Sequence, residues 1–246
     1  MEIEIKKDSI RYKLPNSIIS GILTDNFNIS YKDIYKVNGE RVTNKNRIDL
    51  TKDIIFVDKN IETDLITVEE YMTYYIEVNN LSIKNPEKKI KDSLKIVGLK
   101  DKVLKKNIKE LSSAEKSLIK VSVALLNNPK ELILDEIFTS LDIKLEKKIY
   151  RLLMELNDKY NIGIILLTRD VEKLYKYTGY IVIIKDGKIV SSGNTKEVFV
   201  DVDLLKENNI ELPDIVEFTY KARKVGAKID YHRDIRDIIK DIYKHI

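Results

Sequence analysis

Cysteine is absent from this chain of 246 residues, and glycine is scarce. Without cysteine the protein forms no disulfide bond and offers no thiolate to a metal ion, which fits the reducing environment of a cytoplasm. Glycine matters because a backbone that wraps around a phosphate group needs residues without a side chain at the points of closest approach. Only eight glycines are present, at positions 21, 39, 98, 163, 179, 187, 193 and 226.

Long apolar runs are also missing. The longest, Ile162–Leu167 and Ile181–Ile184, are far shorter than the roughly 18 residues that a membrane-spanning helix requires. The N-terminal sequence MEIEIKKDSI alternates apolar and charged side chains as an edge strand does, and it lacks the apolar stretch of a signal peptide. We therefore expect a cytoplasmic protein, peripheral to the inner face of the cell membrane, that reaches the membrane only through another protein.

Neither sign of charge dominates the chain. It has 44 Lys and Arg against 40 Asp and Glu, interleaved along the sequence, so no nucleic-acid partner is indicated although the isoelectric point is near 8.8. Apolar residues make up 43% and charged residues 34%, the composition of a globular protein with a substantial core. The length fits one domain, or one domain with an appended tail.

The hydrophobic period changes along the chain. Residues 1–60 predict short strands with a turn at Asn38-Gly39, whereas apolar residues within 67–110 recur at helical spacing. Further on, near-continuous apolar strands alternate with helices, which predicts a parallel sheet covered on both faces. The expected strands are Ile3–Ile5, Ile18–Leu23, Ile54–Val57, Glu131–Leu134 and Ile162–Leu167; the expected helices are Ser112–Leu126, Leu141–Tyr160 and Val171–Tyr177; a hairpin is expected at Ile181–Val190, and short charged helices, separated at Pro213 and Gly226, after Gly193.

Three motifs follow one another in the middle of the chain. LSSAEK at Leu111–Lys116 starts a helix, ELILDE at Glu131–Glu136 is an apolar strand that ends in two carboxylates, and SLD at Ser140–Asp142 precedes an amphipathic helix. In this order and at this spacing they resemble the signature loop, the Walker B strand and the D-loop of ABC-type ATPases. The tail sequence Leu212-Pro213-Asp214, followed by a helix and Gly226, resembles the C-terminal extension of the ATPase subunits of energy-coupling factor (ECF) importers.

The resemblance implies a fold class and a domain organisation. The fold would be α/β of the ABC type, P-loop NTPase-like, with a parallel core sheet, an N-terminal antiparallel β part, a helical subdomain and a C-terminal helical tail. Residues 1–200 would form the ABC ATPase-like domain, with the helical subdomain at about 64–115, and residues 201–246 would form the tail.

The phosphate-binding loop of that family is missing from the sequence. A P-loop reads G-x-x-x-x-G-K-[ST], because backbone N–H groups surround the phosphates while the lysine meets the β- and γ-oxygens. The Gly-Lys pair at Gly187-Lys188 lies far downstream in the expected hairpin, with Val182 in place of the first glycine. Upstream, the expected strand Ile18–Leu23 and Val37 are too close together for both a glycine loop and a following helix. We interpret this as a deletion.

Four further positions carry family roles by resemblance. Asp135 stands at the position of the magnesium ligand, and Glu136 at that of the general base for the attacking water. Asp58 stands where a glutamine senses the metal-bound phosphate, and Arg169 replaces a switch histidine. Arginine has no acceptor and stays protonated, so it can only be a fixed cation toward a phosphate. The alternative for the two Walker B carboxylates is a strand end that is solvated or caps a neighbouring helix.

The signature residues are candidates for contact with a nucleotide held by another subunit. In ABC dimers each nucleotide lies between the P-loop of one subunit and the signature helix of the other, so the resemblance implies that Ser112 and the first-turn amides meet a partner's ATP. Asp142 of the D-loop belongs to the same set. However, two glycines of the family motif are replaced by Ser113 and Ala114, and Glu115 adds a negative charge. The alternative is a capped helix without any nucleotide contact.

Tyrosines occupy two other places where the family makes contacts. Tyr71, Tyr74 and Tyr75 fall where the helical domain receives a coupling helix of the membrane subunit, although a stripe at helical spacing is also typical of core packing, which we favour. Tyr12 lies where an aromatic ring stacks on adenine in the family, but no phosphate site is recognised near it.

The sequence therefore predicts a degenerate ATP-binding-cassette subunit of an ABC importer, ECF-like in its tail. It would bind ATP and Mg²⁺ only at a composite site with an intact ATPase subunit and neither of them alone, since a homodimer of this chain would contain no P-loop. A transmembrane transporter subunit would be the other partner. Two alternatives stay open: a scaffold or regulatory protein that never touches nucleotide, and an ATPase that is still active through an unrecognised phosphate loop.

Overall fold

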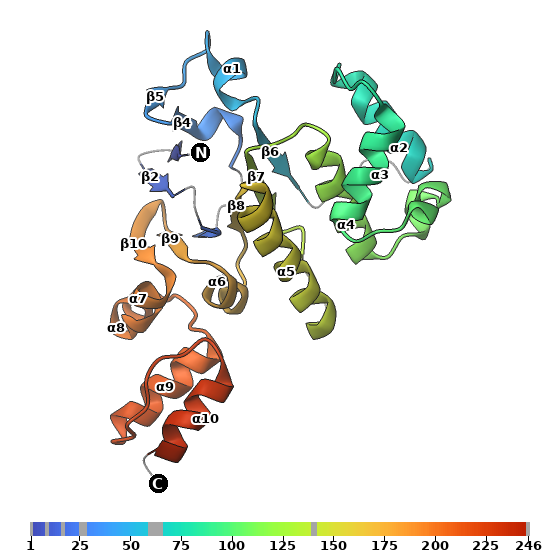
Figure 1. Cartoon of the computed structure of the whole chain (residues 1–246). Helices are drawn as coiled ribbons and strands as arrows, with labels where there is room; N and C mark the ends of the chain where they lie inside the picture. Colours follow the sequence, from blue (N-terminus) through green and yellow to red (C-terminus); the bar gives the residue numbers. More distant parts are fainter. Residues whose placement is uncertain are drawn as a thin grey trace. The chain divides into compact units, whose positions relative to one another are not determined.

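The structure is a computed structural model that describes residues 2–7, 10–15, 18–24, 29–58, 66–138 and 142–244 (Figure 1). Its internal contacts divide the chain into two compact units, one of Thr43–Ile164 and one of Glu2–Val42 together with Ile165–Ile246. Both units combine helices with strands, and most strand pairs apart from the N-terminal sheet are parallel, so the predicted α/β class is confirmed. Across these described ranges, no helix is long and apolar enough to span a bilayer.

The first unit is built on a pair of parallel strands flanked by helices. Strands β6 (Ile54–Val57) and β7 (Glu131–Asp135) run side by side, with Ile54 opposite Glu131 and Val57 opposite Leu134. The apolar runs that predict both strands are therefore confirmed. The helices of this unit are α1 (Arg47–Thr51), α2 (Val68–Val78), α3 (Pro86–Ile96), α4 (Ser113–Leu125) and α5 (Ile143–Tyr160), with 3-10 turns η2 (Asp101–Lys105) and η3 (Ile108–Glu110).

Helices α2, α3 and α4 share one apolar core. Val68, Met72 and Ile76 of α2 recur every four residues and are all buried, as their spacing predicts. These three side chains belong to one buried cluster, to which α3 contributes Ile90 and Leu94. Residues 64 and 65, at the start of the helical subdomain predicted near 64–115, lie outside the described residues, and the bounds of that subdomain stay a prediction. The other buried members of the core are Val103, Leu104, Ile108, Leu111, Ile119, Val123 and Leu126.

The second unit opens with an antiparallel sheet of strand order β2-β1-β4-β5. Asn38 and Gly39 join β4 to β5 with φ angles of 50° and 83°, which is the backbone of the predicted Asn-Gly turn. The predicted N-terminal strand is confirmed as β1, but it lies between β2 and β4, so the prediction of an edge strand is wrong. Strand β2 is not among the expected strands, although apolar and charged residues alternate in it. The bounds are β1 (Ile3–Lys7), β2 (Ile10–Leu14), β4 (Ile34–Val37) and β5 (Glu40–Arg41).

A second sheet in this unit is mixed. Strand β3 (Ser20–Thr24) pairs in parallel with β8 (Gly163–Leu167) on one side and with β9 (Tyr180–Lys185) on the other. Strand β10 (Lys188–Asn194) then returns antiparallel to β9 through the predicted turn at Asp186-Gly187. The core strands are thus mostly parallel rather than wholly parallel, because the closing hairpin adds an antiparallel edge.

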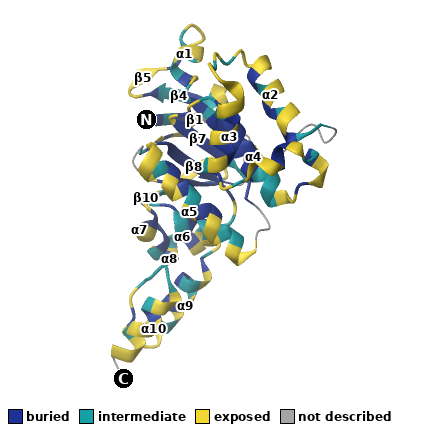
Figure 2. Ribbon diagram, turned by 45° about the vertical axis from the view of Figure 1, so that its right-hand side comes forward, coloured by how far each residue is buried: buried dark blue, intermediate teal, exposed yellow. Residues whose placement is uncertain are grey.

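Short helices complete the second unit, as the charged C-terminal sequence predicts. Pro213 stands at the N-cap of α9, and Gly226, with φ 93°, follows its end. Figure 2 shows many buried residues in the strands, whereas α10 is largely exposed and α9 mixes exposed, half-buried and buried residues. The bounds are α6 (Val171–Tyr177), α7 (Thr195–Val200), α8 (Val202–Glu207), α9 (Asp214–Lys224) and α10 (Ile235–Lys244).

Candidate functional site

The carboxyl ends of β6 and β7 bring two candidate residues together in the first unit. Since Val57 lies opposite Leu134 in a parallel register, Asp58 and Asp135 are the next residues on neighbouring strands. Open α/β sheets bind their ligands at this edge. The Asp58 side chain is 69% exposed, whereas Asp135 is partly buried. The positions predicted for phosphate sensing and for magnesium binding are therefore neighbours.

Helix α4 is tied to both strand ends by side-chain hydrogen bonds. The Lys120 amine donates to the carbonyl oxygen of Asp58 at 2.5 Å and lies 3.9 Å from Asp58 Oδ1. One turn earlier, Ser117 Oγ donates to the carbonyl oxygen of Ile137, just beyond β7. Lys120 is not among the residues predicted from sequence. A lone lysine inside the apolar stretch Leu118–Leu126 is the signal that identifies it.

The Lys120 amine gives the fold a pH dependence. The residue is 7% exposed, and burial lowers its pKa from 10.5 to about 8, although the Asp58 carboxylate opposes the shift. Between pH 8 and 10.5 the unfolded chain keeps a proton that the folded chain has lost, so stability rises with pH across that window. Lys120→Met is expected to abolish this rise, on the order of 2 kcal/mol in the free energy of unfolding.

Urea denaturation at about pH 7 and about pH 10 measures the rise in the free energy of unfolding between these two pH values. Lys91→Met, which replaces an exposed lysine of α3, is the matched control and should leave the pH profile of the parent chain unchanged. Equal profiles for the parent chain and Lys120→Met would contradict the assignment.

Glu136, at the general-base position, has an unusual backbone. Its φ is 48°, in the left-handed region, which costs a residue with a side chain about 1–2 kcal/mol. Among the described residues, the other non-glycine residues with positive φ are all Asn or Asp, which tolerate this conformation better. Strained backbone concentrates at functional sites. This favours a chemical role for Glu136 over that of an ordinary strand end.

The carboxylates fit a magnesium ion only in company with a nucleotide. In the described ranges no group of three or more His, Cys, Asp or Glu side chains is placed to hold a metal ion. Magnesium usually takes one or two carboxylates from a protein and completes its shell with water and phosphate oxygens. Asp135 and the neighbouring Asp58 together supply two carboxylates.

The signature residues form the first turn of α4. Ser112 Oγ accepts the Glu115 N–H at 3.2 Å, and Glu115 Oε2 accepts the Ser112 N–H at 3.0 Å, so the predicted capping box is confirmed. The Ser112 backbone and the Lys106 ammonium at 3.2 Å lower the pKa of the Glu115 carboxyl group. Ser112 and Ser113 are exposed, while Ala114 is half-buried. The helix N-terminus therefore already holds one carboxylate of its own.

The D-loop is described only in part. Ser140 and Leu141 lie outside the described residues. Asp142 is the N-cap of α5, where its Oδ1 accepts the N–H groups of Lys144 and Leu145 at 3.0 and 2.9 Å. Its observed role is therefore to cap a helix.

Arg169 lies in the second unit, in the loop between β8 and α6, and is exposed. It lines a cavity of about 370 Å³ together with Leu23 and Thr24 at the end of β3 and Ile184 and Lys185 at the end of β9. The carboxyl ends of parallel strands therefore converge around it. A guanidinium group at this place is a fixed cation toward an anionic group.

The segment between β3 and β4 contains little regular structure in its described part. After residues 25–28, which lie outside the description, a single 3-10 turn η1 (Tyr31–Asp33) leads directly into β4. The lone glycine of this region, Gly21, is inside β3, where an added Cβ atom would lie 2.5 Å from Leu174 Cδ2. Gly21 therefore allows α6 to pack closely on β3.

The tyrosines differ in their surroundings. Tyr12 is buried in β2, burial raises the pKa of its hydroxyl group, and that hydroxyl has no hydrogen-bond partner within the described structure. A ring buried in this way is not available for stacking on adenine. Tyr71 and Tyr75 pack at the edge of the α2–α4 core, as predicted, whereas Tyr74 is 60% exposed. The prediction of core packing is therefore wrong for Tyr74.

Two sequence comparisons with known proteins agree on one family. The sequence profile of the ABC transporter family matches residues 17–139. The chain is 31% identical to the energy-coupling factor transporter ATP-binding protein EcfA of Methanococcus maripaludis, over 86% of this chain and 77% of the relative.

Two solved structures share the fold. The ABC transporter component cbiO1 of Clostridium perfringens, described as part of the complex cbiONQ, has a TM-score of 0.68 at 21% identity, covering 89% of this chain and 98% of that one. The dimeric ATP-binding cassette MJ0796, bound to ADP and Pi, has a TM-score of 0.62 at 18% identity, covering 79% and 99%.

Proposed function

The chain belongs to the ABC transporter family of ATP-binding subunits, and on this premise we propose that it is a degenerate member which pairs with an intact ATPase subunit in an ECF-type importer. ABC ATPase domains bind ATP, typically with magnesium. In the proposed pair the intact subunit supplies the P-loop, and this chain presents the turn of α4 that begins at Ser112. ATP and Mg²⁺ are then held at a composite site and not by this chain alone.

The main support for this proposal is that the chain keeps one half of an ATP site, the signature, Walker B and D-loop motifs, but not the other half, the P-loop. Ser112 caps α4, β7 ends at Asp135 and Asp142 caps α5, which supports retention of the signature, Walker B and D-loop elements. In contrast, the sequence contains no G-x-x-x-x-G-K-[ST] motif, and Gly21 allows helix packing instead. Two copies of this chain would lack a P-loop altogether, so hydrolysis needs a different partner. The dimeric, nucleotide-bound form of MJ0796 supports a paired arrangement.

Within the composite site we assign roles to the remaining candidates. Asp135 holds the magnesium ion and Asp58 contributes from the neighbouring strand, which their adjacent positions support. We assign the role of general base to Glu136, and its strained backbone supports this assignment. Asp142 belongs to the face that meets the partner, and Arg169 contributes a fixed cation at the switch position.

A transmembrane subunit is the second proposed partner. The relatives EcfA and cbiO1 are transporter components by name, which supports a location at the inner face of the membrane. Tyr74 is the candidate contact because it is exposed and tyrosine is enriched at interfaces. In this arrangement residues 1–200 are the ATPase-like domain and residues 201–246 the tail.

One observation favours a second function, that of a scaffold which never touches nucleotide. The Glu115 carboxylate occupies the N-terminus of α4, held there by Ser112 and Lys106. A phosphate approaching this turn would meet a fixed negative charge where ABC signature loops have none. A scaffold that does not bind nucleotide would keep the capped helix α4. It would not need an N-terminus that is open to a phosphate group.

Ser112→Arg distinguishes the two functions. In the complex purified with an intact ATPase subunit, a bulky side chain at the start of α4 is expected to lower ATP turnover at least about tenfold, because it blocks approach to the partner's nucleotide and removes the cap. Steady-state phosphate release by the complex measures the effect. Ser82→Arg, the same change at an exposed serine between α2 and α3, should leave turnover unchanged.

Unchanged turnover in Ser112→Arg would favour the scaffold. A complex that no longer assembles would be recognised by size-exclusion chromatography. In that case Ser112→Ala, which removes only the hydroxyl group, still reports on turnover.

A further inference from the structure

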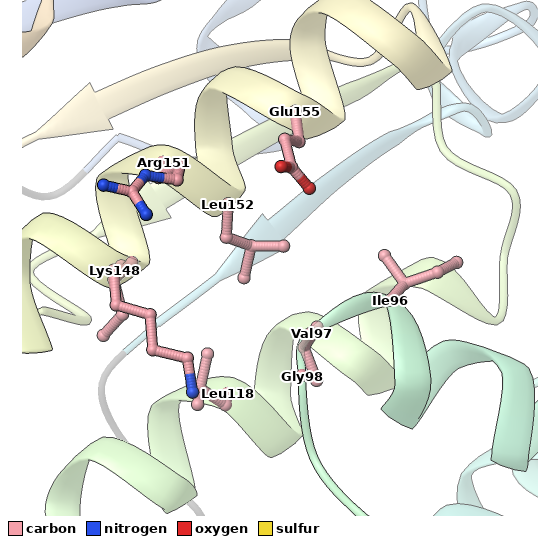
Figure 3. Close-up of a pocket in the computed structure, with 9 residues that line it drawn as sticks. Ile96, Val97, Gly98, Leu118, Lys148, Arg151, Leu152 and Glu155 are labelled. Atoms are coloured by element: carbon pink, nitrogen blue, oxygen red, sulfur yellow. The ribbon is translucent and has the colours of Figure 1, made fainter.

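A groove of about 260 Å³ lies within the first unit, between the end of α3, α4 and α5 (Figure 3). Val97 and Leu118 at its base are buried, with 2% and 5% of their surface exposed. Ile96 and Leu152 are half-buried and form apolar walls on opposite sides. The groove therefore offers an apolar surface that no residue of the described chain fills.

The rim of the groove is positively charged. Lys148 and Arg151 stand on α5, about one turn apart, and both are exposed. Neither forms an ion pair with a carboxylate in the part of the chain that the structure describes. The lining also contains one acidic residue, Glu155, whose Oε1 atom lies 3.6 Å from Lys159 Nζ. The lining thus combines an apolar base with two cations that have no ion-pair partner among the described residues.

We propose that this groove docks an acidic segment of a protein partner, which inserts one bulky apolar side chain and pairs its carboxylates with Lys148 and Arg151. Charge complementarity selects an acidic occupant. The apolar base requires an anchor side chain, as in interface hot spots, and disfavours a bare anion or a nucleic acid, which would leave it unfilled. The volume is below the roughly 300–1,000 Å³ of sites for drug-sized ligands, so a single anchor fits better than a small molecule. The proposal does not rest on nucleotide binding.

Fluorescence polarisation with the full chain tests this docking site. The probe is a short fluorescein-labelled peptide in which one tryptophan is flanked by glutamates, and the expected result is saturable binding. A peptide with lysines in place of the glutamates is expected not to bind, and a peptide with alanine in place of the tryptophan is expected to bind at least about tenfold more weakly. Raising the salt concentration from about 50 mM to about 500 mM should also weaken binding.

Charge reversal locates the site on the chain. Lys148→Glu/Arg151→Glu is expected to weaken binding of the glutamate peptide about tenfold or more. Lys144→Glu/Lys147→Glu makes the same change of charge on the same helix with residues that do not line the groove, and should change the affinity less than about twofold. If charge reversal unfolds the chain by circular dichroism, Lys148→Gln/Arg151→Gln is expected to give the same ranking with a smaller effect.

Three results would overturn the proposal. The first is that no glutamate peptide binds, and the second is that both double variants bind it as tightly as the parent chain. The third is binding of an oligonucleotide, in place of the peptide, that depends on Lys148 and Arg151.

Discussion

Purified alone, the chain is expected to bind MgATP with a Kd no tighter than about 1 mM and to hydrolyse none of it. A triphosphate needs a cradle of backbone N–H groups, a lysine at the β- and γ-phosphates and a helix N-terminus behind them. Between β3 and β4 the sequence has no glycine, and its described part forms only the turn η1. Isothermal titration calorimetry with MgATP measures the affinity directly.

An ABC ATPase that carries the complete G-x-x-x-x-G-K-[ST] motif is the positive control in the same buffer. Micromolar binding by this chain would mean that another loop surrounds the phosphates, and it would replace the proposed composite site with that of an active ATPase. The cavity beside Arg169 would then be the first place to examine, because it lies at the carboxyl ends of β3 and β9. Arg169→Ala would be expected to abolish such binding.

Gly163→Ala is expected to destabilise the first unit by about 1–3 kcal/mol, the range for overpacked cores. Glu131, at the start of β7, is 2% exposed, and an added Cβ atom on Gly163 would lie 2.0 Å from its Oε2 atom. That oxygen is buried and has no hydrogen-bond partner in the described structure. Urea denaturation measures the change in the free energy of unfolding.

A double-mutant cycle isolates this contact. Glu131→Ala removes the carboxylate, so Glu131→Ala/Gly163→Ala is expected to be more stable than Gly163→Ala alone, with a coupling energy of about 2 kcal/mol. Glu131→Ala by itself is the control for the cavity that the truncation leaves. Strict additivity of the two substitutions would contradict a direct contact between them.

The Glu131 carboxyl group also makes the stability of the fold depend on pH. Burial raises the pKa of Glu131 from 4.5 to about 8. Between these values the folded chain keeps a proton that the unfolded chain has lost, so stability falls as the pH rises from about 4.5 to about 8. Glu131→Gln cannot ionise and is expected to remove this fall, on the order of 4 kcal/mol. Parallel pH profiles for the parent chain and Glu131→Gln would rule out a buried, protonated carboxyl group.

Local signals predict much of this fold correctly. Ser112 and Glu115 are three residues apart, and the capping box they form depends only on the first turn of α4. The Asn38-Gly39 turn follows from the ease with which these two residues adopt positive φ. In each case the interacting groups are close in sequence, so the chain itself brings them together.

Burial and strand pairing are less predictable, because they depend on residues that are far apart in sequence. Tyr74 follows the helical period of its neighbours but faces solvent, because the apolar stripe of α2 is narrower than the run of tyrosines suggests. Strand β2 is short and charged on one face, so its pattern is weak on its own and depends on pairing with β1. Tyr12 is buried within that sheet, which removes it as a stacking surface.

By itself, the sequence determined that the chain has signature, Walker B and D-loop motifs but no G-x-x-x-x-G-K-[ST] motif, because each of these is a matter of residue type and spacing. Only the tertiary structure decided which groups meet. It joined the Lys120 amine to the Asp58 carbonyl oxygen across 62 positions, buried Glu131 against Gly163, and opened a groove below Lys148 and Arg151. Strand register and helix packing fix these contacts, and both depend on the burial of apolar surface over the whole unit rather than on local preference.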